Sequence, residues 1–380
     1  MSKKKTMIVS NIFLIGLVSF FMDMSTEMIY PIIPLYLTAV LGATPAIVGV
    51  IEGVAESVAS LLKVASGYIG DRYQNKKRLA FLGYSASVLY KFVLLIAGSW
   101  GGVLAARVID RTGKGIRTAP RDALVAQSSE KGKLGGSYGL HKMLDMAGSS
   151  LGALFAFLFI AFGMKYRAAF LWSVIPGVVA VTIIPLIREE KGAAPNRRRL
   201  ALRGLKLDAR LKWYFAVLFL FCLGNSSNVF LLLKAQSRGF STSEVMLLYL
   251  IFSVSASILA IPAGRLSDRF GRSRILIPGY LIYGLVYLGF ALLTSKVSLL
   301  ILFVAYGAYT AFISGAERAL IAEASPADYQ GTVLGIYGML QGFGLLLSSM
   351  IGGVLGIVSA LLIAVILRSG KGRKAADRPD

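Results

Sequence analysis

The sequence predicts an all-α polytopic membrane protein built from two six-helix bundles, and three observations support this fold class. Hydrophobic residues make up 56% of the 380 residues, and the mean hydropathy of +0.69 is far above that of a soluble domain. Apolar segments long enough to cross a bilayer recur along the whole chain. A short motif also repeats about half a chain apart, as expected of a duplicated bundle.

Twelve apolar segments are expected to span the membrane, and the last is short because the final two share residues 332–367. The expected units are an N-terminal bundle at 1–187, a basic linker at 188–212, a C-terminal bundle at 213–367 and a tail at 368–380. The predicted segments are Met7–Val40, Pro45–Ile69, Leu79–Ser99, Gly101–Gln127, Leu134–Met164, Ala168–Ile187, Trp213–Leu233, Ser243–Ala263, Ile275–Thr294, Ser298–Glu323, Thr332–Leu355 and Gly356–Leu367.

The placement of Lys and Arg predicts the orientation. Basic residues cluster before the first segment, after the second, fourth and eighth, in the linker and in the tail, whereas the alternate loops carry few charges. The positive-inside rule then places both termini in the cytoplasm of a multi-pass protein of the inner (plasma) membrane. The first apolar run continues into a full span, so no cleavable signal is expected. The net charge of +22 is therefore a topology signal, and we expect no nucleic-acid partner.

The internal repeat consists of GYIGDR at 67–72 and GRLSDRFGR at 264–272, an offset of 264 − 67 = 197 residues. Both copies closely resemble the loop signature of the major facilitator superfamily, G-x-x-x-D-R-x-G-R-K. The first copy departs from it at Gln74, where the family has Gly. The resemblance covers essentially the whole chain. It implies two six-helix bundles related by a pseudo-two-fold axis and a transporter with a central cavity.

In that family the carboxylate of the loop binds the N-terminus of a neighbouring helix, and the Arg residues bridge to facing carboxylates. These contacts hold one conformation and are released during the transport cycle. The resemblance therefore assigns a gating role to Asp71, Arg72, Asp268 and Arg269. The alternative is that this cluster of Lys and Arg only fixes the topology.

The segment Gly101–Gln127 is long enough to span the membrane, yet it carries a stripe of charges. At about 100° per residue, six of them fall within about 120° of the helix circumference. Lipid cannot accept such a face, so the stripe must face a protein interior or a water-filled cavity. The six residues are Arg107, Asp110, Arg111, Lys114, Arg117 and Arg121.

Two interpretations of the stripe remain open. Arg and Lys at successive turns can bind carboxylate or phosphate oxygens, which makes Arg107, Arg111, Lys114 and Arg117 candidate substrate-binding residues. Alternatively, the stripe is a structural ion network neutralised by Glu52, Glu56, Asp110, Asp122 and Asp145.

The stripe also carries a family resemblance. Arg107 lies where the fourth helix of the family carries its motif Arg, followed here by Gly113 and Gly115. In drug/proton antiporters of the family, that Arg is linked to proton coupling. The stretch DRTGKGIRTAPRDAL resembles a prokaryotic subgroup of the superfamily. Arg121 and Asp122 lie nearer the cytoplasm, and we expect them to act in gating.

Carboxylates in the first and second segments are candidates for proton coupling. Asp23, Glu27 and Tyr30 share one helical face, and Glu56 lies on the charged face of the second segment. A low-dielectric cavity favours the neutral form of a carboxylic acid, and a nearby Arg favours the charged form. This competition is what a proton-coupled carrier needs, so Asp23, Glu27, Glu56 and Asp110 are the predicted coupling residues and Tyr30 a cavity residue. Permanent salt bridges to the stripe are the alternative.

The second half carries fewer charges. Asn225 and Asn228 are predicted substrate contacts, and Tyr306, Tyr309 and Gln341 can hydrogen-bond a solute. Interhelical hydrogen bonding explains each of them equally well.

Five further polar residues have simpler expected roles. His141 is expected to be a solvated or hydrogen-bonded histidine, and Lys91 is either another cavity charge or, as favoured, a lysine that reaches the membrane surface. Residues 317–323 contain Glu317, Arg318 and Glu323, and we expect them to form a compact ion network.

Several functions are excluded by what the sequence lacks. The lone Cys222 allows no disulfide framework, and the lone His141 allows no polyhistidine metal site. The sequence also shows no phosphate loop, nucleophile–base pair or metal-ligand spacing, so we expect neither an enzyme nor a cofactor.

The sequence therefore predicts a monomeric secondary transporter whose partners are membrane lipids, a small-molecule substrate, and protons or another coupling ion. Proton-coupled efflux of a small organic solute, anionic or metal-chelating, is the favoured interpretation. The alternatives are a cationic or lipophilic multidrug exporter, and a non-transporting membrane receptor or scaffold. The sequence leaves uptake open as well.

Overall fold

The computed structural model describes residues 3–189, 207–224 and 238–344, together with 205, 231, 234–235 and 347–348. Within these residues the chain forms helices and no β-strand. The helices are α1 (Lys3–Glu27), α2 (Ile32–Leu35), the π-helical turn η1 (Tyr36–Val40), α3 (Pro45–Tyr73), α4 (Lys76–Ile96), α5 (Trp100–Gln127), α6 (Leu134–Ala161), α7 (Tyr166–Ile183), the 3-10 turn η2 (Ile184–Leu186), α8 (Ala209–Gly224), α10 (Thr242–Phe270), α11 (Arg272–Leu292), α12 (Lys296–Ala324) and the 3-10 turn η4 (Ala327–Tyr329), followed by helical residues 330–344.

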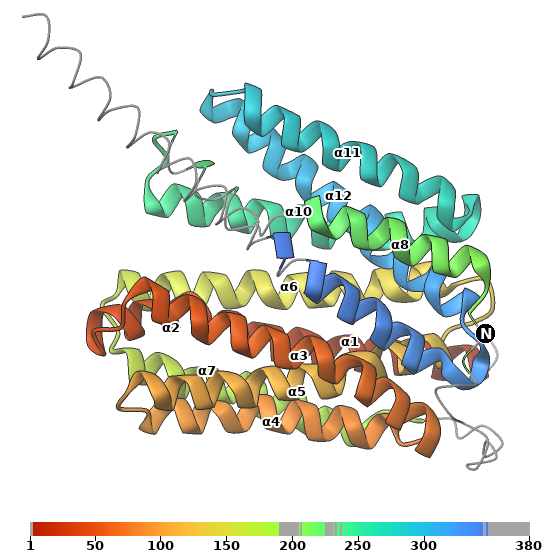
Figure 1. The fold of residues 1–380 in the computed structure, drawn as a ribbon, viewed down its shortest axis with the longest axis horizontal. Helices are drawn as coiled ribbons and strands as arrows, with labels where there is room; N and C mark the ends of the chain where they lie inside the picture. Colours follow the sequence, from red (N-terminus) through yellow and green to blue (C-terminus); the bar gives the residue numbers. More distant parts are fainter. Residues whose placement is uncertain are drawn as a thin grey trace, which may run out of the picture.

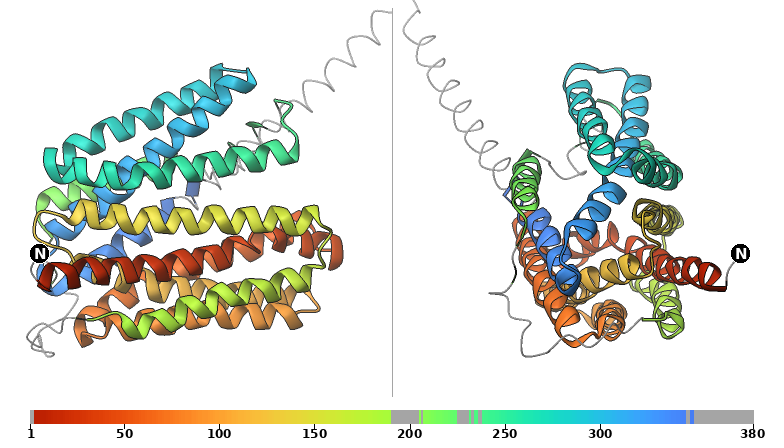
Figure 2. Two further views of the ribbon diagram at one scale, coloured as in Figure 1. Left: turned by 180° about the vertical axis from the view of Figure 1, so that it is seen from behind. Right: turned by 90° about the vertical axis from the view of Figure 1, so that its right-hand side faces the viewer.

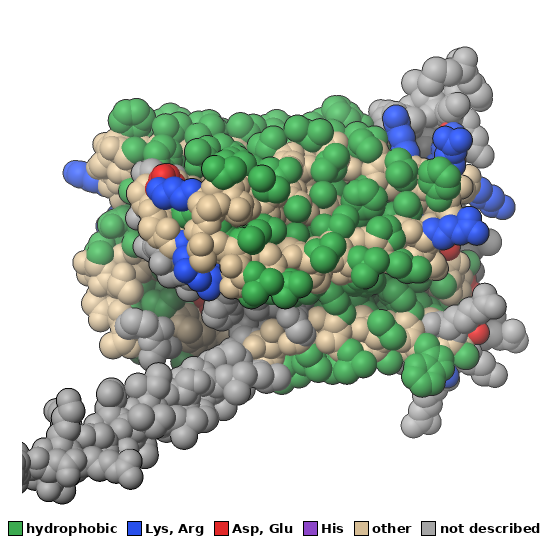
Figure 3. Space-filling view, turned by 90° about the horizontal axis from the view of Figure 1, so that it is seen from above, with side chains coloured by type: hydrophobic (Ala, Val, Ile, Leu, Met, Phe, Trp, Pro, Cys, Tyr) green, Lys and Arg blue, Asp and Glu red, His purple; other side chains and the backbone are tan. Residues whose placement is uncertain are grey.

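The surface of the bundle is that of a membrane protein. Seven stretches within the described residues are long and apolar enough to cross a bilayer. Large apolar side chains such as Ile96, Phe162 and Leu285 are mostly exposed, as expected where lipid replaces water as the solvent. Figure 3 shows hydrophobic side chains over the flank of the molecule and Lys and Arg at its ends. These features confirm the predicted all-α membrane fold.

The helices form two bundles that lie one above the other (Figure 1). The N-terminal half contains α1 and α3 to α7, and the C-terminal half contains α8, α10 to α12 and residues 330–344. Between the halves, α6 packs along α10 and α12, and Figure 2 shows this pairing from two further sides. We call the end of the molecule where α1 begins and where α3, α5 and α10 end the basic end; it lies at the right in Figure 1.

Each half has its own apolar core. Ile29, Tyr36 and Phe170 belong to a cluster confined to the N-terminal half. Phe252 and Phe303 belong to a cluster in the C-terminal half, which Met146 of α6 also joins. Two further clusters cross the boundary, because Ala319 and Ala322 of α12 join a cluster of the N-terminal half and Ala123 of α5 joins one of the C-terminal half.

Glycines bring the two halves into backbone contact at the basic end. A Cβ added to Gly67 would lie 2.2 Å from the carbonyl oxygen of Gly331, and one added to Gly264 would lie 2.2 Å from that of Gly135. No side chain fits at such distances, so these crossings depend on small residues.

The first predicted segment differs from the structure, and the last cannot be compared with it. The expected first segment, Met7–Val40, is interrupted: α1 ends at Glu27, and the chain turns before α2 starts after Pro31. The ring of Pro31 disfavours helical geometry at the residue before it. The predicted twelfth segment, Gly356–Leu367, lies outside the described residues, as do the tail and most of the linker. The bundle boundaries stay predictions.

Candidate functional site

Asp71 lies near the end of α3, is almost fully buried and binds the first turn of the helix at 330–344. Its carboxylate accepts hydrogen bonds from the backbone N–H groups of Gly331 (3.0 Å) and Thr332 (2.6 Å) and from the Thr332 hydroxyl (2.8 Å). Lys76 completes the site at 3.3 Å. N–H groups in a first turn have no partner within their own helix, so a carboxylate satisfies them and interacts with the helix dipole.

Asp268 makes the corresponding contact from α10. Its two oxygens accept the N–H groups of Gly135 (2.8 Å) and Gly136 (2.7 Å) in the first turn of α6. Its charge partner is Arg272, which also pairs with Glu323. We call these two contacts the Asp71 latch and the Asp268 latch. Each joins one half of the molecule to the other at the basic end.

The arginines of the repeated motif do not bridge to carboxylates as the resemblance implied. Arg72 donates to the hydroxyl of Tyr68 (3.0 Å), and Arg269 lies over the ring of Phe270. Among the described residues neither forms an ion pair, because Lys76 and Arg272 take the positions beside the latch carboxylates. The gating roles predicted for Arg72 and Arg269 stay predictions.

The stripe on α5 begins with an ion pair between the fully buried Arg107 and a partly exposed carboxylate. Arg107 binds Glu52 of α3 with two parallel hydrogen bonds of 2.9 and 2.6 Å and reaches Asp110 at 3.3 Å. Arg111 lies 3.6 Å from Glu56 and also faces Glu52 and Asp110. Two arginines therefore meet three carboxylates, which is the neutralised arrangement of the structural interpretation.

Tyr30 completes this cluster. The guanidinium carbons of Arg107 and Arg111 lie 5.4 and 6.0 Å from the centre of its ring. Glu52 and Glu56 keep about a third and a quarter of their side chains accessible. Because the carboxylates of this cluster reach open space while Arg107 does not, a solute would meet negative charge first.

The stripe continues toward the basic end with Lys114 and Arg117. Arg117 donates to the hydroxyl of Ser87 and lies over the ring of Tyr84 (4.7 Å). Among the described residues, Lys114 forms no direct ion pair with Glu27 or Glu56, although its charge acts on both carboxyl groups.

Asp23 of α1 interacts with Asp145 of α6, so the interior of the N-terminal half contains two facing carboxyl groups. Asp145 is paired with Lys142 at 2.9 Å. Two carboxyl groups this close together make the pair a candidate site for proton uptake. The sequence predicted Asp23 for proton coupling and did not single out its partner.

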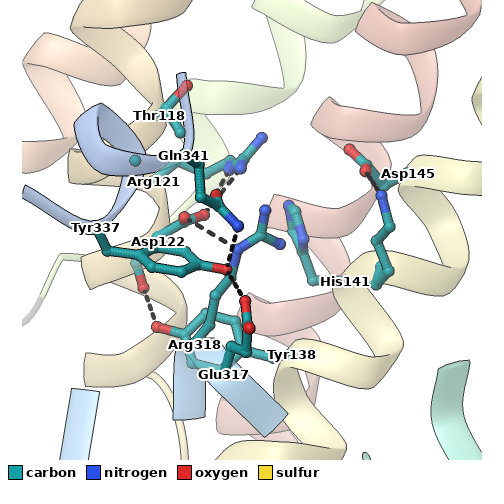
Figure 4. A network of polar contacts seen from close by, with 12 residues as sticks. Thr118, Arg121, Asp122, Tyr138, His141, Asp145, Glu317, Arg318, Tyr337 and Gln341 are labelled. Carbon is teal, nitrogen blue, oxygen red and sulfur yellow. Dashed lines mark hydrogen bonds and ion pairs between the residues drawn. The ribbon is translucent and has the colours of Figure 1, made fainter. Parts of the chain in front are cut away.

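Asp122 links the two halves through charge (Figure 4). Arg121 donates twice to one carboxylate oxygen, at 3.0 and 2.8 Å, and Arg318 of α12 lies 3.4 Å from the other. The hydroxyl of Tyr138 donates to the backbone carbonyl of Asp122 (2.8 Å). This ion pair lies beside the latches and joins α5 to α12.

For two buried polar residues, Lys91 and His141, the structure decides what the sequence left open or predicted wrongly. Lys91 does not reach the membrane surface: it is fully buried and donates to the backbone carbonyl of Ser87 (2.9 Å). It points into the bundle because a carbonyl acceptor is available there. His141 is also fully buried and hydrogen-bonds to Ser19 (2.8 Å), so it is not solvated.

Glu317, Arg318 and Glu323 do not form the single ion network expected. Glu317 accepts hydrogen bonds from the hydroxyls of Tyr280 and Tyr337, whereas Glu323 pairs with Arg272 at the basic end. Neighbouring residues on a helix point about 100° apart, so Glu317 and Arg318 reach different partners.

A cavity of about 290 Å³ lies between α6 and the C-terminal half. Its wall contains six aromatic rings, two cations and one carboxylate. The lining residues are Lys142, Met146, Ser149, Leu218, Phe221, Cys222, Tyr249, Phe252, Tyr306, Tyr309, Thr310, Ile313, Ser314, Glu317, Arg318, Tyr337 and Gln341.

The cavity includes some predicted contact residues and leaves others elsewhere. Tyr306, Tyr309 and Gln341 line it, but Gln341 also donates to the hydroxyl of Tyr337 (2.8 Å), so their role as solute contacts stays a prediction. The basic stripe and Tyr30 do not, and Asn225 and Asn228 lie outside the described residues. Among the described residues, no three His, Cys, Asp or Glu side chains form a group that could hold a metal ion.

Comparison with known proteins identifies the family. Residues 15–349 match the sequence profile of the Major Facilitator Superfamily. A protein of Methanocaldococcus jannaschii, described as an uncharacterised MFS-type transporter, is 35% identical over 357 residues, which cover 92% of this chain and 89% of the relative. The fosmidomycin resistance protein of Escherichia coli is 26% identical over 268 residues, covering 67% and 64%.

Solved structures share the fold at low sequence identity. The human organic anion transporter MFSD10 has a TM-score of 0.74 at 14% identity, covering 92% of this chain and 93% of that one. The proton:xylose symporter XylE has a TM-score of 0.71 at 17% identity, covering 94% and 91%. The latches, the two bundles and these matches agree: the chain belongs to the Major Facilitator Superfamily of membrane transporters.

Proposed function

We propose that this protein exports a small organic solute, anionic or metal-chelating, in exchange for protons. It works by alternating access in the inner (plasma) membrane, with the basic end and both termini in the cytoplasm. Two relatives support the direction by their names: the fosmidomycin resistance protein of Escherichia coli, and the aspyridones efflux protein of Emericella nidulans, which is 25% identical over 300 residues.

The observation that carries alternating access is the position of the cavity relative to the latches. The cavity is walled by residues of both halves, such as Lys142 on α6 and Tyr306 on α12. Both latches close the basic end by joining those same halves. Releasing Asp71 and Asp268 would therefore open the cavity toward the cytoplasm while the helices of each bundle stay packed.

Proton coupling is assigned to the facing carboxyls of Asp23 and Asp145. A single residue, Lys142, connects this pair to the cavity. Lys142 is paired with Asp145, and it also lines the cavity. An exchanger needs the proton and the solute to favour different conformations. Asp145 suits this because α6, on which it lies, also provides the N-terminus bound in the Asp268 latch.

Inside-out membrane vesicles with an acidified lumen test the proposal. Fosmidomycin, an anionic chelating phosphonate, is expected to dissipate the pH gradient in vesicles that contain the wild-type protein. Vesicles with the Asp23→Asn variant should keep the gradient. A gradient unaffected by fosmidomycin and by a panel of aromatic carboxylates and phosphonates would contradict proton exchange of an anionic solute.

The second candidate is export of cationic or lipophilic drugs. Glu317 places a carboxylate in the cavity wall, and six aromatic rings surround the same space. Aromatic faces and a carboxylate together attract organic cations. Dissipation of the gradient by ethidium, with none by fosmidomycin, would favour this candidate.

A further inference from the structure

We propose that Arg318 binds the anionic group of the transported solute, and that Asp122 competes with that group for the same guanidinium. The proposal rests on the export function above and gives it a binding residue and a charge class. It also explains how the affinity of the cavity changes as the basic end opens and closes.

Arg318 has donors to spare. Its side chain is 17% exposed and lines the cavity, and its Nε atom lies 3.4 Å from Asp122. Nε and Nη1 are buried and have no hydrogen-bond partner among the described residues. A guanidinium has five N–H donors, and leaving buried donors unpaired is unfavourable. Once Arg318 moves away from Asp122, an oxyanion in the cavity would satisfy them.

Asp122 does not depend on Arg318. One of its oxygens already receives two hydrogen bonds from Arg121, at 3.0 and 2.8 Å. Figure 4 shows Arg318 reaching Asp122 from the opposite side, next to the ring of His141. The Nδ1 atom of that ring also lacks a partner among the described residues. If Arg318 turned to a solute, Asp122 would still be paired.

The other charged groups of the cavity wall are engaged. Lys142 is paired with Asp145, and Glu317 accepts hydrogen bonds from Tyr280 and Tyr337. Among the described lining residues, Arg318 is thus the cation with unused donors. Carboxylate, phosphate and phosphonate groups match its planar fork. The surrounding aromatic rings suit an apolar body attached to such a group.

The competition between Asp122 and the solute for Arg318 depends on whether the basic end is closed or open. With both latches closed, α5 and α12 are held together and Asp122 occupies Arg318. When the basic end opens, the two helices separate, Arg318 loses Asp122 and the solute takes its place. The cavity therefore binds an anion more tightly when open to the cytoplasm than when closed to it. An exporter needs this difference in affinity, because it must bind solute on the cytoplasmic side and release it on the other side.

Binding to the purified full-length protein in nanodiscs tests the site. The probes are 1-naphthoate and its neutral counterpart 1-naphthamide, which have the same size. Wild type should prefer the carboxylate by at least about tenfold, the effect of one charge-assisted hydrogen bond. Arg318→Gln should abolish the preference. The control Lys296→Gln, which removes a cation paired with Glu244 at the opposite end, should keep it.

Removing the competitor should have the opposite effect. Asp122→Asn should tighten 1-naphthoate binding by several-fold and leave 1-naphthamide unchanged. If Asp122→Asn leaves Arg121 unpaired and misfolds, the double variant Arg121→Gln/Asp122→Asn serves the same purpose. A carboxylate preference that persists in Arg318→Gln would overturn the proposal, as would failure of 1-naphthoate to bind wild type or unchanged affinity after loss of Asp122.

Distances across the basic end provide a second readout. Spin labels on Arg78→Cys of α4 and Arg274→Cys of α11, with Cys222→Ala throughout, report the separation of the halves. Saturating 1-naphthoate should increase the longer-distance population, and Asp122→Asn should do so without a probe. A probe-induced shift toward the shorter distance would contradict the proposal.

The two proposals fail in different ways. If fosmidomycin still dissipates the pH gradient in Arg318→Gln vesicles while naphthoate binding is unchanged, proton-coupled export stands and Arg318 is not the anion site. If wild-type vesicles show no exchange but naphthoate binding depends on Arg318 and Asp122, the binding site stands without the export function.

Discussion

Asp71 and Asp268 lie 268 − 71 = 197 positions apart and make the same contact in opposite directions. Asp71 of the N-terminal half accepts the N–H groups at 331–332 of the C-terminal half. Asp268 of the C-terminal half accepts those at 135–136 of the N-terminal half. The two latches are thus related by the same pseudo-symmetry that relates the bundles, and each half supplies one carboxylate and one helix N-terminus.

Asp71→Asn should shift the conformational equilibrium toward the open basic end. The variant keeps the size of the side chain but removes its charge, and a hydrogen bond to a charged group contributes about 1.5–3 kcal/mol. We expect an increase of roughly tenfold in the open population and a matching loss of transport. Spin-label distances between α4 and α11 measure the shift. Asp328→Asn, which changes an exposed carboxylate nearby, is the control; equal behaviour of the two variants would contradict the latch.

Gly67→Ala should also weaken the closed state, for a steric reason. The added methyl group would lie 2.2 Å from the carbonyl oxygen of Gly331, so the halves must move apart. Gly53→Ala is the matched control on the same helix, because its added carbon meets no atom within 4 Å. Gly67→Ala should therefore open the basic end and slow transport while Gly53→Ala behaves as wild type. Equal transport rates would show that the close crossing is not needed.

Arg107→Ala should destabilise the N-terminal half by about 3 kcal/mol, the lower part of the range for breaking a buried pair, because Glu52 is partly exposed. Arg107→Lys should restore little of the lost stability, because a single ammonium group cannot reproduce the two parallel hydrogen bonds. The double variant Arg107→Ala/Glu52→Gln should recover part of the loss, because it removes the carboxylate left unpaired. Thermal unfolding in detergent measures all three. Equal stability of Arg107→Ala and wild type would rule out the structural role of this pair.

Asp23→Asn and Glu27→Gln should change the pH dependence of transport. Each removes a carboxyl group that can take up a proton, and Asp23 is one member of the facing pair with Asp145. Glu244→Gln is the control: the hydrogen bond from Lys296 lowers the pKa of Glu244 to about 2, so this residue stays ionised throughout the neutral range. The measurement is the rate of proton-driven transport as a function of pH for each variant and for wild type. Wild-type profiles in both Asp23→Asn and Glu27→Gln would remove the first helix from the coupling scheme.

The latch carboxylates were predictable from the sequence because each sits in a recognisable repeat. Their partners were not. Apart from the Thr332 hydroxyl, the donors at 331–332 and 135–136 are backbone N–H groups, which every non-proline residue has, so side-chain chemistry does not mark them. Only the packing of α3 against residues 330–344, and of α6 against α10, selects which N–H groups meet the carboxylates.

The charged stripe was half predictable. Helical periodicity placed the charges of α5 on one face, and the four-residue spacing of Glu52 and Glu56 indicated a matching face on α3. Periodicity cannot tell how close two helices lie, so it left open whether Arg107 was paired or free. Lys91 was misjudged for a related reason, since its acceptor is the backbone carbonyl of Ser87.

The cavity was the least predictable part. Its wall is built from residues scattered over α6, α8, α10, α12 and residues 330–344. No continuous stretch of sequence contains this group, so the sequence alone does not reveal it. The sequence predicts Tyr306 and Tyr309 as possible solute contacts because they are polar aromatic residues in an apolar helix. The pairing of Arg318 with Asp122 requires knowledge of which helices face each other across the two halves.

The use of backbone donors in both latches has a consequence for how such a gate can evolve. Asp71 binds the main-chain N–H groups of Gly331 and Thr332 and only one side-chain donor, the Thr332 hydroxyl, so most of this contact does not depend on side-chain chemistry in the opposing helix. What it cannot change freely is volume, because Gly331 and Gly135 lie against the opposite backbone. Homologous carriers can therefore diverge widely in sequence along these helices while conserving the gate, provided that substitutions at the crossings remain small.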